Sequence, residues 1–199
     1  LGCGSGRAAL PLAERGYDVV AADLSRPMLQ VTLRKASPIR AVGKLLPLHV
    51  NLVDLECLAD QTADHAICLF STLGMIQGQE NRRKLLRHTA RILRPGGSLL
   101  LHVHNRWAAV TQPGGIGSLV GSWWRASRSS QWEFGDATYN YRGIEGMFMH
   151  RFSKRELLRE LKVCNWDVSE ILSVSIDGSK IVDGAKISGG YIVWCTAAE

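Results

Sequence analysis

The chain begins with a glycine-rich turn, Gly2-Cys3-Gly4-Ser5-Gly6, directly before a helical pattern. Residues 18–22 (DVVAA) then predict a short buried strand that ends at Asp23. A glycine turn lets the backbone approach a ligand closely and point free N–H groups at it. An acid at the end of the following strand can accept both hydroxyls of an adenosine ribose. Arg7 stands where the dinucleotide fingerprint G-x-G-x-x-G needs its third glycine, so the turn favours a ligand without a pyrophosphate.

Helical and strand patterns alternate along the rest of the 199 residues, which predicts an α/β fold with a largely parallel sheet. The expected strands are residues 18–22, 47–50, 65–70, 98–104, 167–176 and 190–196. The expected helices are residues 7–15, 81–93, one that opens at Ser25-Arg26-Pro27, and one that runs from the capping box Ser153–Glu156 to Val163. The pattern fails over residues 106–145, so this segment is interpreted as an insertion or substrate lid with a short helix around 116–124.

Composition excludes several classes of protein. Hydrophobic residues make up 46% of the chain and charged residues 21%, which is ordinary for a globular domain. Five cysteines without a CxxC pair indicate reduced thiols in a cytosolic protein, and neither a membrane-spanning stretch nor a leader is visible, so we expect a cytoplasmic location. The sequence has no metal-ligand cluster, P-loop or nucleophile elbow, and we predict no metal.

Two stretches resemble the class I S-adenosylmethionine-dependent methyltransferases: LGCGSGRAALPLAERGYDVVAADLSRPML at the start, and LRPGG before the strand at 98–104. The resemblance covers Leu1–Asn105 well and the remainder in outline. It implies a three-layer α/β/α sandwich with a Rossmann-like, mostly parallel seven-stranded sheet whose last strand is antiparallel. It also implies S-adenosylmethionine as cofactor.

The resemblance assigns cofactor roles to particular residues. Gly2, Gly4 and Gly6 would line the methionine part, and Asp23 would hold the ribose hydroxyls. Leu24 and Met28 would flank the adenine. The remaining expected cofactor residues are Asn51, where many relatives place an Asp that contacts the adenine amino group, Leu52, and Phe70 and Ser71 beside the methyl-donor pocket.

Methyl transfer is an in-line displacement, so the enzyme mainly has to hold the acceptor close to the methyl group and exclude water. His104 is the candidate general base because it lies at the carboxyl end of a predicted strand. A packed, hydrogen-bonded histidine is an equally good interpretation. Thr72, Asn105 and Tyr141 are candidate acceptor-binding residues, and His150 and Tyr139 face either the cleft or a sheet edge.

Positive charge is concentrated in residues 81–132, which hold nine Lys or Arg and neither Asp nor Glu, within a chain of formal net charge +6. Four of the six tryptophans lie there too. Basic side chains among aromatic ones can bind nucleic acid. The interpretation we favour is a solvated helix face followed by a lid; a membrane-surface role for residues 116–124 is a third possibility.

The sequence therefore predicts a methyltransferase whose acceptor is a small molecule. The alternatives are an RNA or protein methyltransferase that uses the basic segment, and a non-catalytic cofactor-binding protein of the same fold. The family's glycine turn follows the first, central strand of the sheet, and Leu1 would be the last residue of that strand. We accordingly expect residues 1–199 to be one domain lacking most of that strand, to fold poorly when expressed alone, and to be of undetermined oligomeric state.

Overall fold

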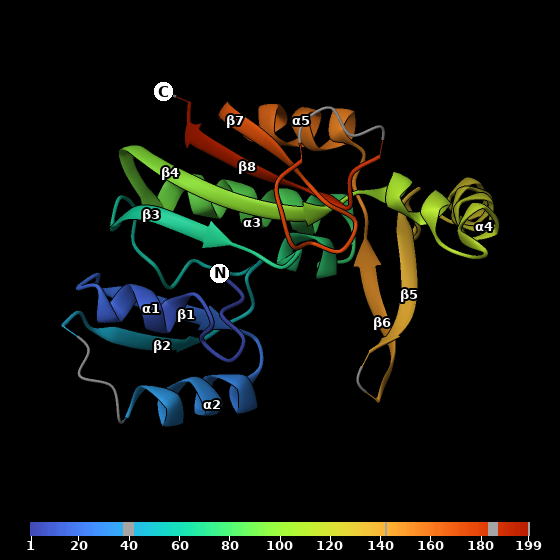
Figure 1. The fold of residues 1–199 in the computed structure, drawn as a ribbon. Helices are drawn as coiled ribbons and strands as arrows, with labels where there is room; N and C mark the ends of the chain where they lie inside the picture. Colours follow the sequence, from blue (N-terminus) through green and yellow to red (C-terminus); the bar gives the residue numbers. More distant parts are fainter. Residues whose placement is uncertain (38–41, 142, 183–186, 199) are drawn as a thin grey trace. The chain divides into compact units, whose positions relative to one another are not determined.

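The computed structural model describes residues 1–37, 42–141, 143–182 and 187–198, without the side chains of Tyr141 and Ile144. The chain forms two compact units, Leu1–Cys57 and Leu58–Glu199. Figure 1 shows the elements of each unit.

The first unit places its helices against a pair of parallel strands. Its elements are α1 (Ala9–Glu14), β1 (Val19–Asp23), α2 (Arg26–Ala36) and β2 (Leu45–His49). In the register of this pair Asp23 lies opposite His49. Helix α2 begins at the N-cap Ser25, whose hydroxyl accepts the Met28 N–H, and proline occupies its first turn as the sequence predicts. Small buried side chains such as Ala21 and Ala22 let helix and strand pack closely.

The second unit is built on a four-stranded sheet of order β3-β4-β8-β7. The strands are β3 (Ala63–Cys68), β4 (Leu93–His104), β7 (Trp166–Val174) and β8 (Gly190–Ala197). Strands β3 and β4 are parallel, and β8 is antiparallel to both β4 and β7. The antiparallel last strand that the sequence predicts is thus present, while the count of seven strands in one sheet stays a prediction.

Two helices of this unit pack against each other. Helix α3 (Gln79–Ile92) and helix α5 (Lys154–Val163) are joined by Glu160, which accepts hydrogen bonds from Gln79 and Arg83. The capping box at Ser153 and Glu156 is present as predicted. Leu85, Leu86, Leu157 and Leu161 are buried, so both helices contribute their apolar faces to the core.

The segment interpreted as an insertion has more regular structure than its sequence suggests. It contains η2 (Arg106–Thr111), helix α4 (Gly115–Arg128) and most of a hairpin of β5 (Asp136–Tyr141) and β6 (Ile144–His150) (Figure 1). Burial in this hairpin could not be read from hydrophobicity, because the polar residues Asp136 and His150 are buried beside Met149. The short helix expected around 116–124 is found and is longer than expected.

Candidate functional site

Backbone and side-chain contacts fix the glycine turn to β1 and α2 of the first unit. The Cys3 N–H donates to the Ala22 carbonyl, and the Thr32 hydroxyl donates to the Gly4 carbonyl at 2.9 Å. Gly4 has a φ of +52° with no atom within 4 Å of the place where a Cβ would lie, so open space borders its backbone. At Gly6 a Cβ would lie 2.9 Å from the Thr32 methyl group, so the turn packs closely on α2 there.

The carboxylate of Asp23 is held in place by two backbone amides. Gly4 N–H donates to Oδ2 at 2.7 Å and Ser25 N–H donates to Oδ1 at 2.8 Å. Each carboxylate oxygen has more than one lone-pair site, so acceptor capacity remains for two further donors. The donor set that the vicinal hydroxyls of a ribose present fits this arrangement, and the open space beside Gly4 admits a ligand next to it.

Two exposed apolar side chains follow Asp23. Leu24 and Met28 are 66% and 43% exposed, which leaves them free to contact the faces of a purine. Asn51 is exposed, and its side-chain oxygen accepts the Val53 N–H at 3.3 Å. Leu52, in contrast, is only 6% exposed and belongs to the core of the first unit. These roles stay predictions, and Leu52 is the least suited to touch a ligand directly.

In the second unit, two residues after β3 have left-handed backbone conformations. Phe70 and Ser71 have φ of 55° and 61°, which costs energy in non-glycine residues and is typical of functional sites. Ser71 is fully buried; its N–H donates to the His102 carbonyl and its Oγ accepts the His104 N–H at 3.2 Å. Ser71 therefore ties the end of β3 to the end of β4.

His104 and Asn105 are neighbours at the end of β4. They differ in exposure and in whether their side-chain hydrogen-bonding groups are available to a ligand. His104 is exposed, and its pKa is lowered by partial desolvation and by the charge of Arg151, so its imidazole is neutral at pH 7. Asn105 is buried, donates to Ser188 and accepts the Trp107 N–H. Its amide is fully used in the fold, so it is a structural residue and less suited to bind an acceptor.

The other expected acceptor-binding residues are Thr72 and Tyr141. The Thr72 hydroxyl donates to the Leu69 carbonyl, a local turn contact. Tyr141 pairs through its backbone with Ile144 at the tip of the hairpin, and its side chain lies outside the described residues. Neither observation tests the predicted role.

Most of the positive charge in residues 81–132 is neutralised by carboxylates that lie outside this segment. Six of its nine cations form ion pairs: Arg82 with Glu133, Arg83 with Glu160, Arg87 with Glu80, Arg91 with Asp60, Arg94 with Asp64, and Arg106 with Glu156. Arg82 is only 3% exposed. The helix face is therefore solvated and locally neutral rather than an open cationic surface.

A buried cluster of charged groups joins α3, the hairpin and α5. His150, which the sequence placed at a cleft or sheet edge, is completely buried; Nδ1 lies 2.6 Å from Asp136 and Nε2 lies 3.1 Å from Glu156. Burial lowers the pKa of His150, and the hydrogen bond to Asp136 raises it. Burial also lowers the pKa of Arg106 to about 10.

Three groups of this cluster have the composition of a metal site. Possible ligand atoms of Glu133, His150 and Glu156 lie within 4.8 Å of one another. Arg82 and Arg106 already pair with the two carboxylates, and both imidazole nitrogens have partners, so we interpret the group as an internal ion-pair cluster. The sequence revealed only the capping role of Glu156.

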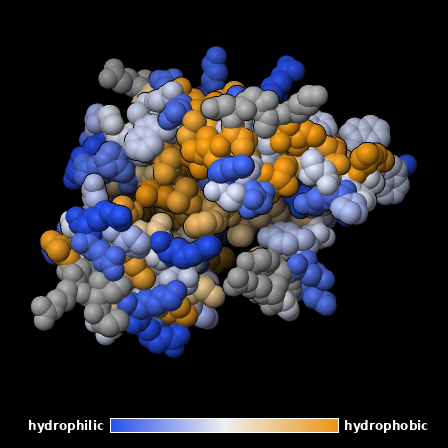
Figure 2. Space-filling view, viewed as in Figure 1, coloured by the Kyte–Doolittle hydropathy of each residue, from blue (hydrophilic) through white to orange (hydrophobic). Residues whose placement is uncertain are grey.

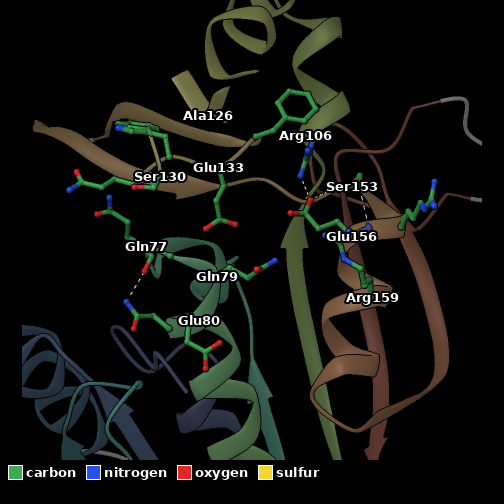
Figure 3. A pocket seen from close by; sticks show the side chains of 16 residues that line it. Gln77, Gln79, Glu80, Arg106, Ala126, Ser130, Glu133, Ser153, Glu156 and Arg159 are labelled. Carbon is green, nitrogen blue, oxygen red and sulfur yellow. Dashed lines mark hydrogen bonds and ion pairs between the residues drawn. The ribbon is translucent and has the colours of Figure 1, made fainter. Parts of the chain in front are cut away.

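A polar cavity of about 1000 Å³ borders this cluster. Figure 3 shows Glu133, Glu156 and Gln79 around the same space, with Arg106 beside Glu156. Gln77, also in the lining, follows β3 and η1 (Thr72–Met75), and Arg106 follows β4. The cavity therefore lies beyond the carboxyl ends of these strands, the edge at which open α/β sheets bind ligands.

Comparison with known sequences agrees with the geometry of the first unit. Residues 1–97 match the family model of a methyltransferase domain. The chain is 38% identical over 101 residues to the cypemycin N-terminal methyltransferase of a Streptomyces species, across 51% of this chain and 39% of that protein. It is 29% identical over 107 residues to the tRNA 5-carboxymethoxyuridine methyltransferase of Escherichia coli K12, across 52% of this chain and 38% of that protein. The match thus spans about two fifths of each relative.

Solved structures share the fold along the whole chain. An S-adenosylmethionine-dependent methyltransferase from Methanosarcina mazei superposes with a TM-score of 0.78 at 18% identity, over 100% of this chain and 91% of that one. The CcbJ methyltransferase of Streptomyces caelestis gives a TM-score of 0.71 at 20% identity, over 100% and 82%. The chain has the Rossmann-like α/β fold of class I S-adenosylmethionine-dependent methyltransferases, and its first 97 residues carry the sequence signature of a methyltransferase domain.

Proposed function

We propose that this protein transfers a methyl group from S-adenosylmethionine to a small-molecule acceptor. The observation that carries the proposal is the Asp23 carboxylate, held by two backbone amides beside a glycine turn with open space in front of it. When bound, S-adenosylmethionine supplies an activated methyl group on a sulfonium. Gly2, Gly4 and Gly6 would hold its methionine part, Asp23 its ribose, and Leu24, Met28 and Asn51 its adenine.

We propose His104 as the group that accepts a proton from the acceptor. Its lowered pKa keeps the imidazole neutral at neutral pH, which a base requires. Ser71 would act as a positioning residue, since its Oγ accepts the His104 backbone N–H. The cavity beside Arg106 would receive the polar part of the acceptor, and its mixture of amide and charged groups favours a polar small molecule.

The paired arginines favour a small molecule over RNA. Binding to RNA needs several protein cations that are free to neutralise phosphates and so displace the counterions of the RNA. Six of the nine cations in residues 81–132 already pair with carboxylates. One relative is named as a tRNA methyltransferase and another as an N-terminal methyltransferase, so RNA and peptides with free N-termini both belong in the test.

We also propose that the two units belong to one methyltransferase domain, with residues 106–145 as the insertion that completes the acceptor pocket. Support comes from the Methanosarcina mazei enzyme, whose single chain superposes on all of this one. No helix among the described residues is both long enough and apolar enough to cross a membrane.

The test is release of S-adenosylhomocysteine by the full-length protein from S-adenosylmethionine, with panels of small amines, phenols and carboxylic acids, peptides with free N-termini, and bulk tRNA. Acceptor-dependent release with a small molecule, absent in Asp23→Asn, is expected. Release with tRNA alone, accompanied by a salt-dependent gel shift, would replace the small-molecule assignment. Cofactor binding without release on any panel would favour the non-catalytic alternative.

A further inference from the structure

Helix α4 presents its large apolar side chains to solvent. Ile116, Val120, Trp123 and Trp124 are each between 53% and 68% exposed. The first three are spaced four and three residues apart, so they lie on one face of the helix. Figure 2 shows hydrophobic residues at the surface over η2 and α4. We call these four residues the α4 apolar face.

Small residues hold another face of α4 against neighbouring parts of the second unit, at Ala109 and at residues 135–136. The buried Ser122 hydroxyl donates to the Asp136 carbonyl at 3.0 Å and accepts the Gly135 N–H at 3.1 Å. A Cβ at Gly115 would lie 1.6 Å from the Ala109 carbonyl oxygen, so no larger residue fits there. The hydrogen bonds and this close approach set the rotation of α4, and its apolar face points outward as a consequence.

Charge at the end of α4 has one sign. Residues 106–132 contain no Asp or Glu. Arg106 pairs with Glu156, but neither Arg125 nor Arg128 forms an ion pair with a carboxylate within the described part of the chain. The Arg128 guanidinium lies 3.9 Å from the ring centroid of the exposed Trp124, and that of Arg125 lies 4.7 Å from the ring centroid of Trp132. Arg128 thus borders the α4 apolar face through Trp124, whereas Arg125 lies on the other side of the helix, against Trp132.

We propose that the α4 apolar face docks on an anionic lipid surface, lying in the interface without crossing it. Aliphatic and tryptophan side chains on one face, with Arg128 at its border, are the composition of an interfacial helix. Contact with a second copy of the chain is the alternative occupant, and the test below separates the two.

The test is co-sedimentation of the full-length protein with phosphatidylcholine vesicles, alone and with 30% phosphatidylglycerol. At low salt, binding about fivefold tighter to the anionic vesicles is expected, since one arginine near the surface, Arg128, adds about a factor of five. The double variant Val120→Ser/Trp123→Ser should weaken this binding at least tenfold, because it removes an aliphatic and an indole side chain from the interface.

A matched control variant removes one exposed aliphatic and one exposed tryptophan side chain elsewhere in the second unit. Ile181 and Trp194 are 54% and 43% exposed outside α4, so Ile181→Ser/Trp194→Ser should bind vesicles as the parent protein does. Quenching of tryptophan fluorescence by brominated lipid should fall in Trp123→Ser and persist in Trp194→Ser. Circular dichroism and thermal melting identify any variant that is simply unfolded.

Three outcomes would overturn the proposal. The first is the absence of vesicle binding at any lipid composition, and the second is equal loss in both double variants. The third is a concentration-dependent dimer, seen by light scattering, that Val120→Ser/Trp123→Ser abolishes; it would assign the face to contact between two copies. None of these outcomes depends on methyl transfer, so they leave the proposed activity to its own test.

Discussion

The Asp23 carboxylate accepts the Gly4 N–H at 2.7 Å and so joins the end of β1 to the glycine turn that precedes α1. The same carboxylate accepts the Ser25 N–H from the start of α2. One side chain thereby sets the relative positions of the two parts of the chain expected to hold the ribose and the methionine of the cofactor. The proposed binding function and the local fold depend on the same two oxygens.

Asp23→Asn should weaken S-adenosylmethionine binding about 100-fold, because two ribose hydroxyls lose a charged acceptor and an amide N–H comes to face a backbone donor. Isothermal calorimetry measures the affinity. Asp18→Asn is the matched control: Asp18 Oδ1 accepts the Lys44 N–H at 2.8 Å just before β1, at its opposite end. The control should lose stability but retain affinity. Equal affinity in the two variants would contradict the assignment of Asp23.

The two glycines Gly4 and Gly6 should respond differently to alanine. Gly4→Ala places a methyl group in open space, so the variant should fold with a cost of about 1 kcal/mol from its positive φ while binding cofactor poorly. Gly6→Ala forces its methyl group against Thr32 and Leu10, so it should be destabilised by about 2–3 kcal/mol. Urea unfolding and calorimetry together separate the effects. Full cofactor affinity in Gly4→Ala would show that no ligand occupies that space.

His104 should set the acidic limb of the pH–rate profile. Burial and the charge of Arg151 lower its pKa below the usual 6.5, so the neutral base predominates at pH 7, and kcat/KM should fall as pH falls through the lowered pKa. His104→Gln should lose activity by a factor of about 100 together with that limb, at unchanged cofactor affinity. His65→Gln is the control, because His65 bonds to Ser98 near the start of β3. An unaltered profile in His104→Gln would remove the histidine from the reaction.

Local sequence signals were sufficient to predict most helices and strands and the part of the candidate site that lies in the first unit. The turn at Gly2–Gly6, the acid at Asp23 and the cap at Ser153 each depend on residues close together in the chain, and each is found where predicted. Strand β4 begins earlier than the expected strand at 98–104, because Leu93–Gly97 are contained within it where the register against β3 shifts.

The contacts that change the interpretation of the basic segment are remote in sequence. Arg82 meets Glu133 across 51 residues, and Arg83 meets Glu160 across 77. A list of charges along the chain cannot show such pairs, so nine cations appeared as an exposed patch. His150 pairs with Asp136 in the hairpin, which is one of the two places expected for it, but its complete burial could not be read from the sequence because that burial depends on partners that only the folded hairpin supplies.

Glu160 should contribute more to stability than any exposed acid of α3. Its side chain is 5% exposed and accepts two bonds from Arg83, at 2.7 and 3.2 Å, and one from Gln79 at 2.9 Å. Glu160→Ala leaves the partly buried Arg83 without a partner and should cost about 3 kcal/mol. Glu80→Ala, which breaks an ion pair with Arg87 between exposed side chains, should cost less than about 1 kcal/mol. Urea unfolding compares the variants, and in the double variant Arg83→Met/Glu160→Leu an apolar pair should restore most of the loss. Equal costs for Glu160→Ala and Glu80→Ala would show that the α3–α5 contact does not depend on this carboxylate.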